Sequence, residues 1–165
     1  MSTRNPHLMP RTIPLAVGDI APDFTLLDQD RREWKLSEHV RTGSVVLSFA
    51  PLAFTGICST EMGCIHKDAA RWKGKGVAIV GISCDSFAVQ KAWAAQEGYT
   101  QCLLADMHRE VCKAYGLYWA DLNVSQRGTY VIAKSADGKG KITFVEAREP
   151  GNAMDWEKVL GLVGG

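Results

Sequence analysis

Cys58 is the residue whose position in the sequence best suits it to covalent chemistry. Residues 44–50 before it form a mostly apolar run that is typical of a buried strand, and residues 59–67 after it have the character of a helix. Cys58 is therefore expected at a helix N-terminus, where unpaired backbone N–H groups and the helix dipole stabilise an anion. Because a thiolate, unlike a thiol, attacks electrophilic oxygen and sulfur, this position predicts a nucleophilic cysteine.

Three neighbours of Cys58 suit a reacting sulfur, and each also has an ordinary structural interpretation. The hydroxyl of Thr55 can donate to and accept from both the sulfur and its substrate, or it can only cap the helix. Pro51 lacks an N–H group and offers an apolar wall that keeps water away, or it only ends the strand. Glu61 lies about 60° around a helix from Cys58. As a first-turn carboxylate, it would also interact favourably with the positive end of the helix dipole.

Pro51, Thr55 and Cys58 together form the pattern Pro-x-x-x-Thr-x-x-Cys. This pattern resembles that of the peroxiredoxins, the cysteine-dependent peroxidases. Further segments resemble the same family in the same order, and the resemblance covers residues 15–163. Within the family, the sequence is most similar to the bacterial alkyl hydroperoxide reductase E type. The segments that carry the likeness outside the cysteine region are residues 18–24, 81–86, 106–116 and 127–132.

The resemblance implies a thioredoxin-like α/β fold, with a central mixed sheet flanked by helices and an N-terminal β-hairpin. It also implies that Cys58 reduces hydrogen peroxide and organic hydroperoxides through a sulfenic acid, while Pro51 shields the sulfur. Arg127 would hold the thiolate and the peroxide through parallel guanidinium donors, and Glu61 would orient Arg127. No metal, haem or flavin is implied, and the expected assembly is a homodimer or a larger assembly of dimers.

A sulfenic acid must be reduced before it oxidises further, and the sequence leaves two routes open. Cys64 lies six positions after Cys58, about 120° around a helix and about 9 Å along its axis. A disulfide needs Cα atoms within about 7 Å, so Cys64 can resolve Cys58 only if the first turns unwind. We therefore expect a one-cysteine cycle completed by an external thiol (thioredoxin, a glutaredoxin or a low-molecular-weight thiol), with a two-cysteine cycle through Cys64 as the alternative.

Helix and strand signals alternate along the chain, which indicates an α/β fold with a mainly parallel sheet. Residues 15–165 are expected to form a single domain, preceded by a loose arm over residues 1–14. Asn152 is expected to cap a final helix, and Cys84, Cys102 and Cys112 are expected to be small core residues. The expected strands are 24–27 and 32–36 as a hairpin, 45–50, 77–83, and 129–133 paired with 141–147; the expected helices are 59–73, 86–97 and 106–115.

The composition excludes several functions. The net charge of the 165 residues is only +1, which argues against binding to nucleic acid or to an anionic membrane. No apolar run approaches the roughly 18 residues that a membrane span requires, and the first 14 residues do not resemble a signal peptide. Five cysteines without disulfide-scaffold spacing favour a reducing, cytoplasmic location.

Four other cysteine chemistries were weighed against the peroxidase interpretation. A phosphatase loop needs arginine six positions after the cysteine, where Cys64 stands, and a thioredoxin-type enzyme needs Cys-x-x-Cys, which the sequence lacks. A zinc site built from Cys58, Cys64 and His66 lacks an evident fourth ligand. A non-enzymatic redox sensor or chaperone stays open; slow peroxide turnover with a fast change of oligomeric state would favour it.

Overall fold

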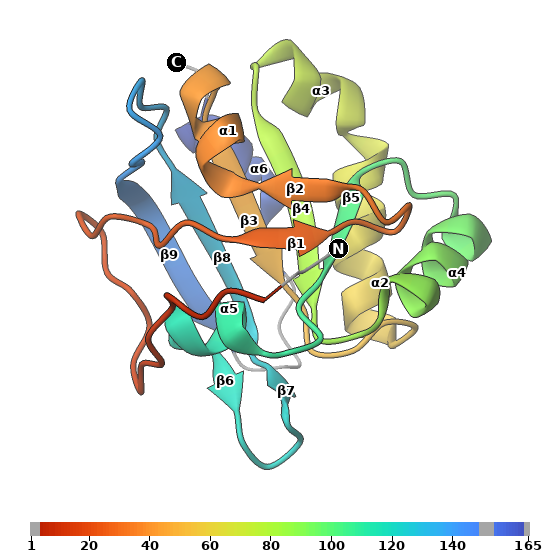
Figure 1. The fold of residues 1–165 in the computed structure, drawn as a ribbon. Helices are drawn as coiled ribbons and strands as arrows, with labels where there is room; N and C mark the ends of the chain where they lie inside the picture. Colours follow the sequence, from red (N-terminus) through yellow and green to blue (C-terminus); the bar gives the residue numbers. More distant parts are fainter. Residues whose placement is uncertain (1–3, 149–153, 164–165) are drawn as a thin grey trace.

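A computed structural model describes residues 4–148 and 154–163 of the chain (Figure 1). Its centre is a seven-stranded sheet in the order β2-β1-β5-β4-β3-β8-β9, beside a separate pair, β6-β7. β3, β4 and β5 are parallel to one another, and the other pairings are antiparallel. The sheet is therefore mixed, as the resemblance implied. It is not mainly parallel, as the alternation of helix and strand signals suggested, because the hairpin strands and β8-β9 add antiparallel neighbours. The strands are β1 (Thr25–Leu27), β2 (Glu33–Lys35), β3 (Val45–Phe49), β4 (Ala78–Ser83), β5 (Cys102–Ala105), β6 (Tyr118–Trp119), β7 (Val124–Ser125), β8 (Arg127–Ile132) and β9 (Ile142–Arg148).

Helices cover both faces of the sheet and separate two hydrophobic cores. Figure 1 shows α1 (Leu36–Thr42) and α5 (Glu110–Ala114) in front of the sheet, with α2 (Gly56–Lys67), α4 (Phe87–Glu97) and α6 (Trp156–Leu162) behind it; α3 (Ala69–Gly74) continues from α2. Because successive strand residues point to opposite faces, Leu47 of β3 joins the core under α1 and α5, whereas Val46 joins the core under α2, α4 and α6.

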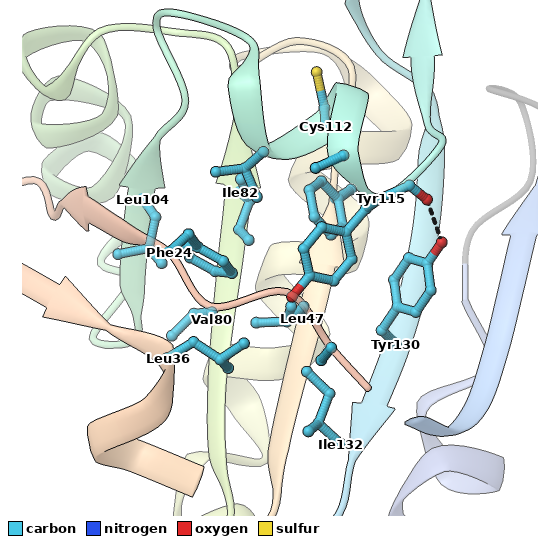
Figure 2. Packing of buried hydrophobic residues seen from close by; sticks show 14 of the residues in the cluster. Phe24, Leu36, Leu47, Val80, Ile82, Leu104, Cys112, Tyr115, Tyr130 and Ile132 are labelled. Carbon is cyan, nitrogen blue, oxygen red and sulfur yellow. Dashed lines mark hydrogen bonds between the residues drawn. The ribbon is translucent and has the colours of Figure 1, made fainter. Parts of the chain in front are cut away.

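The core under α1 and α5 is built around aromatic side chains. The ring of Tyr115 lies 5.5 Å from Phe49 and 5.2 Å from Tyr130 between ring centroids. The Tyr130 hydroxyl donates to the Tyr115 carbonyl at 2.6 Å, the bond drawn in Figure 2. Burial raises the pKa of Tyr130 to about 12, so this hydroxyl keeps its proton at neutral pH. The bond joins the end of α5 to β8.

Several predicted elements are present where they were expected. The N-terminal hairpin forms with Thr25 opposite Lys35, and β8 pairs with β9. The side chain of Ser86 accepts from the Val89 N–H at 3.2 Å at the start of α4, and Gly98 ends that helix with φ +74°. These elements were predictable because their start and stop signals lie within the elements themselves.

Other predictions need correction. The single helix predicted over residues 59–73 is two helices, because Asp68 leaves helical geometry (φ −98°, ψ 18°). Its N–H closes α2 by bonding to the Cys64 carbonyl, and its own carbonyl accepts from Trp72 in α3. Cys102, expected to be a small core residue, begins β5 and is only half-buried. The predicted cap Asn152 lies outside the described residues; the side chain of Asp155 caps α6.

The described part of the N-terminal segment differs from the loose arm that the sequence suggested. The Asn5 side chain exchanges two hydrogen bonds with the backbone of Thr25, at 2.9 and 3.0 Å. The Arg4 guanidinium donates to Glu110, and the Arg11 N–H donates to the Lys113 carbonyl. Residues 4–11 therefore lie against β1 and α5. None of the helices in residues 4–148 and 154–163 combines the length and apolar character that crossing a membrane requires.

Candidate active site

Cys58 is the third residue of α2, immediately after the loop that leaves β3. The residue is only 1% exposed. The first helical hydrogen bond runs from the Ser59 N–H to the Thr55 carbonyl at 2.8 Å, so the N–H groups of the preceding turn have no acceptor within the helix. The sulfur therefore lies at a buried helix N-terminus, where backbone donors and the helix dipole favour negative charge.

Arg127, the first residue of β8, donates to two acceptors on α2. Its Nη2 donates to the Cys58 sulfur at 3.2 Å, and its Nη1 donates to Glu61 Oε2 at 2.6 Å. The other oxygen, Glu61 Oε1, accepts from the Met154 N–H at 2.7 Å. Arginine and glutamate are 2% and 0% exposed, and a buried ion pair of this kind needs such complete hydrogen bonding to offset desolvation.

The guanidinium of Arg127 in β8 contacts both the sulfur of Cys58 and the carboxylate of Glu61 in α2. The contact between Glu61 and Arg127 that the resemblance implied is present in the structure, although the two residues are 66 positions apart. In the contact between Arg127 and Cys58 the sulfur is the acceptor, which is the role that a thiolate fills best. Glu61 thus contacts the same guanidinium group that contacts the sulfur.

The loop between β3 and α2 is fixed to the end of β4. The Ala53 N–H donates to Asp85 Oδ2 at 2.9 Å, and the same oxygen accepts from the Ser83 hydroxyl at 2.8 Å. Phe54 has φ +62°, a left-handed conformation that is uncommon for residues other than glycine. Asp85 was not singled out from the sequence, because its role is to hold a backbone N–H rather than to resemble a catalytic group.

Pro51 and Thr55 frame the loop from its two ends. Pro51 is buried two residues after the end of β3, and Thr55 is the exposed N-cap residue of α2. The Thr55 side chain makes no capping bond; its hydroxyl donates to the Leu52 carbonyl at 2.8 Å. The hydroxyl therefore donates within the loop and not to the sulfur, as had been expected. This bond uses its proton and leaves the oxygen lone pairs free to accept.

Side chains from outside α2 hold its first turns in place. Trp93 Nε1 donates to the Ser59 hydroxyl oxygen at 3.2 Å, and the Tyr99 hydroxyl donates to the Ser59 carbonyl at 2.8 Å. Gln101 Nε2 donates to the Met62 carbonyl at 2.9 Å. Tyr99 and Gln101 were not identified from the sequence. Together they oppose unwinding of the helix around Cys58.

Cys64 lies on the same continuous helix but on a different face. Cys64 is exposed, whereas Cys58 is buried, and both are free thiols. Within the described residues, the metal-compatible cluster of His, Cys, Asp or Glu is Cys84, Asp106 and Cys112. Among the described residues, Cys58, Cys64 and His66 therefore do not form the cluster that the considered zinc site would need.

Comparisons with known proteins identify relatives of this chain. The sequence pattern of the AhpC/TSA family matches residues 17–144. Alkyl hydroperoxide reductase E of Mycobacterium tuberculosis (strain ATCC 25618 / H37Rv) is 37% identical over 143 residues, which is 86% of this chain and 91% of that protein. Thiol peroxidase of Oceanobacillus iheyensis is 35% identical over 148 residues, covering 87% of this chain and 85% of that protein.

A solved structure has a similar fold. Peroxidoxin BcpB from Mycobacterium tuberculosis matches with a TM-score of 0.77 and 29% identity, over 88% of this chain and 94% of that chain. A mixed sheet flanked by helices, with a cysteine at the N-terminus of the helix after β3, defines a thioredoxin-like fold with a thiol site. The chain belongs to the AhpC/TSA family, the peroxiredoxins.

Proposed function

We propose that the protein is a thiol-dependent peroxidase in which Cys58 attacks hydrogen peroxide or an organic hydroperoxide. The observation that carries the proposal is the 3.2 Å contact between Arg127 Nη2 and the Cys58 sulfur, with Arg127 braced by Glu61. A buried guanidinium beside a sulfur at a helix N-terminus can stabilise both the attacking thiolate and the charge that develops on the leaving oxygen. Membership of the peroxiredoxin family supports the same reaction class.

In the proposed reaction, the Cys58 thiolate attacks the peroxide oxygen that carries hydrogen. A sulfur–oxygen bond forms while the oxygen–oxygen bond breaks, which leaves Cys58 as a sulfenic acid. The departing hydroxide or alkoxide takes a proton from solvent and leaves as water or an alcohol. Arg127 would stabilise the departing oxygen, the Thr55 oxygen would accept from the peroxide O–H, and Pro51 would exclude water from the sulfur.

We further propose a one-cysteine cycle completed by an external thiol. The donor thiol would attack the sulfenic sulfur, expel water and form a mixed disulfide, which a second thiol would then release. Support comes from the continuous α2 helix, in which Cys64 is exposed and Cys58 buried. The donor classes that fit are thioredoxin, a glutaredoxin and a low-molecular-weight thiol. A two-cysteine cycle through Cys64 is the alternative, and it requires α2 to unwind.

Counting thiols separates the two cycles. The reduced wild-type, Cys58→Ser and Cys64→Ser proteins are each mixed with one equivalent of hydrogen peroxide and then alkylated in denaturant. Loss of one thiol in wild type and in Cys64→Ser, and of none in Cys58→Ser, supports the one-cysteine cycle. Loss of two thiols in wild type but one in Cys64→Ser would make Cys64 the resolving residue. Unchanged thiols in wild type would overturn the peroxidase proposal and favour the redox-sensor alternative.

The proposed assembly is a homodimer, or a larger assembly of dimers, formed at the active-site loop. Leu52, Phe54 and Ile57 in this region are apolar and 39%, 46% and 37% exposed, which suits burial against a second copy. Leu52→Glu is expected to produce monomers at concentrations where wild type is dimeric, as measured by sedimentation. Leu122→Glu, at an apolar site 53% exposed elsewhere, should leave the dimer intact.

The free thiols further suggest a reducing compartment such as the cytoplasm.

A further inference from the structure

Two other thiols lie next to each other on the face of the sheet opposite Cys58. Cys84 follows directly after β4, Cys112 lies in α5, and their sulfur atoms are 3.9 Å apart. Both belong to the core under α1 and α5, whereas Cys58 belongs to the other core. Figure 2 shows Cys112 on α5 near Ile82, at one end of that core. The pair is therefore separated from the peroxidase site by the sheet.

The two sulfur atoms are within reach of a covalent bond. A disulfide has a sulfur–sulfur distance of about 2.05 Å, so the observed contact of 3.9 Å must shorten by only about 1.9 Å. The sequence spacing of 28 positions gives no hint of this proximity, because the fold brings the end of β4 against α5.

The two thiols differ in access to solvent. Cys84 is 8% exposed and Cys112 is fully buried. The contact with Cys84, together with burial, raises the pKa of the Cys112 thiol, so Cys112 stays protonated until a base removes its proton. Cys84 is therefore the thiol that an oxidant reaches first, and Cys112 is the thiol that can follow.

A base lies next to Cys112. A carboxylate oxygen of Asp106 and the two sulfur atoms all lie within 4.8 Å of one another. Burial raises the pKa of Asp106 to about 6, so it is largely ionised at neutral pH yet more basic than an ordinary carboxylate. It can accept the Cys112 proton as that sulfur reacts.

We propose that Cys84 and Cys112 form a second redox site, which excess peroxide converts to an intramolecular disulfide. In the first step, the Cys84 sulfur attacks peroxide; the oxygen–oxygen bond breaks, giving a sulfenic acid at Cys84 and one water. In the second, the Cys112 sulfur attacks Cys84, Asp106 takes the thiol proton, and the sulfenic oxygen leaves with that proton as a second water. Two thiols are thus oxidised by two electrons, and one hydrogen peroxide is reduced to two waters.

The same three residues also have the spacing of a metal site, but the hydrogen bonds of Asp106 favour the disulfide. Asp106 Oδ1 accepts from the Val111 N–H at 3.2 Å, and Oδ2 accepts from the Cys112 N–H at 2.8 Å. Both oxygens are therefore already held by the backbone of α5. A disulfide uses the sulfur pair as it stands and leaves those bonds in place.

The test uses the Cys58→Ser protein, so that its outcome does not depend on the proposed peroxidase reaction. The reduced, folded protein is treated with excess hydrogen peroxide, blocked with N-ethylmaleimide in denaturant and digested with trypsin without reduction. Trypsin separates the thiols: Cys84 lies in peptide 76–91, Cys102 in 92–109 and Cys112 in 110–113. We expect a linked pair of peptides 76–91 and 110–113, which separates on reduction.

Two further variants in the Cys58→Ser background sharpen the test. Cys102→Ser removes a half-buried cysteine that is not part of the pair, and it should leave the linked peptides unchanged. Cys112→Ala should instead leave a sulfenic acid on Cys84 that dimedone traps. If Cys112→Ala does not fold, the linked peptides from the parent protein still decide the matter.

Three results would overturn the proposal. The first is recovery of peptides 76–91 and 110–113 fully labelled with N-ethylmaleimide after the treatment with excess hydrogen peroxide. The second is linkage of Cys84 to a cysteine other than Cys112. The third is a protein purified with one equivalent of zinc whose Cys84 and Cys112 resist peroxide until a chelator removes the metal.

Discussion

At the scale of single residues, the guanidinium of Arg127 is the group on which the site depends. It donates to the sulfur of Cys58 and to the carboxylate of Glu61 through two different nitrogens. A lysine ammonium is a single point of charge on a flexible chain and cannot hold both acceptors in one plane. The planar guanidinium can therefore stabilise negative charge on the sulfur and at the same time be held in one orientation by the carboxylate.

Arg127→Lys is predicted to slow the reaction with peroxide strongly while the protein still folds. Because one positioned donor to a developing oxyanion contributes about 10² to 10³ in rate, we expect the second-order rate constant with hydrogen peroxide to fall by that factor. Rapid mixing with fluorescence detection measures it. Arg71→Lys, at an exposed ion pair with Glu157, is the control and should react at the wild-type rate. An Arg127→Lys protein that reacts as fast as wild type would remove Arg127 from the mechanism.

At the scale of elements, the ion pair between Arg127 and Glu61 joins β8 to α2, and Glu61 also accepts from Met154 ahead of α6. Replacing one member of a buried ion pair leaves the other charge uncompensated. Glu61→Gln is therefore predicted to lower the free energy of unfolding by about 3 kcal/mol, as measured by urea denaturation. Glu157→Gln removes an exposed ion pair with Arg71 and should change stability little. Equal effects of the two substitutions would contradict the structural role assigned to Glu61.

Asp85 supports the active-site loop from the end of β4. Asp85→Ala removes the acceptor for the Ala53 N–H, and small displacements of a reacting group cost up to about a hundredfold in rate. We expect the peroxide rate constant to fall roughly ten- to a hundredfold, with thiol content unchanged. Asp137→Ala, which removes the acceptor for the Lys139 N–H in the turn before β9, is the matched control. A wild-type rate in Asp85→Ala would mean that the loop holds its position without this bond.

The sequence predicted elements whose signals are local and missed those that depend on the fold. Ser86 and Gly98 mark the two ends of α4 on their own. The strand β5 was missed because its four residues form a short apolar run without alternation, which helices and strands share. The break at Asp68 was missed because apolar residues continue through it to Trp72.

The same distinction holds in the candidate site. Cys58 was predicted from the neighbouring strand and helix alone, because the helix N-terminus is a local feature. The role of Arg127 and its link to Glu61 required the resemblance to a family, since 66 positions separate the two residues. Asp85 and the contact between Cys84 and Cys112 were not predicted, because a loop anchor and a sulfur pair exist only once the sheet has formed.

At the scale of the whole molecule, the buried carboxyl of Asp106 links stability to pH. Burial raises its pKa from the ordinary 3.8 to about 6, so the folded protein holds this proton more tightly than the unfolded chain. The contribution of Asp106 to the free energy of unfolding is therefore largest below about pH 4 and declines by up to about 3 kcal/mol as the pH rises to about 6.

Comparison with Asp106→Asn isolates this effect from the other carboxyl groups. Urea denaturation of both proteins at pH 4.5 and pH 7 should show that the stability of wild type relative to the variant is greater at pH 4.5. A difference that instead grows with pH would mean that the bonds from the Val111 and Cys112 N–H groups outweigh burial and favour the ionised carboxylate.

The proposed peroxidase site lies on one face of the sheet, around Cys58. Trp93 donates to Ser59, the residue after Cys58, so its fluorescence should report a change at the sulfur. The most direct measurement is rapid mixing of the reduced wild-type and Cys58→Ser proteins with hydrogen peroxide while tryptophan fluorescence is followed. We expect a fast phase in wild type whose rate rises linearly with peroxide concentration and which is absent in Cys58→Ser. A fast phase that survives in Cys58→Ser would contradict the assignment of Cys58 as the reacting thiol.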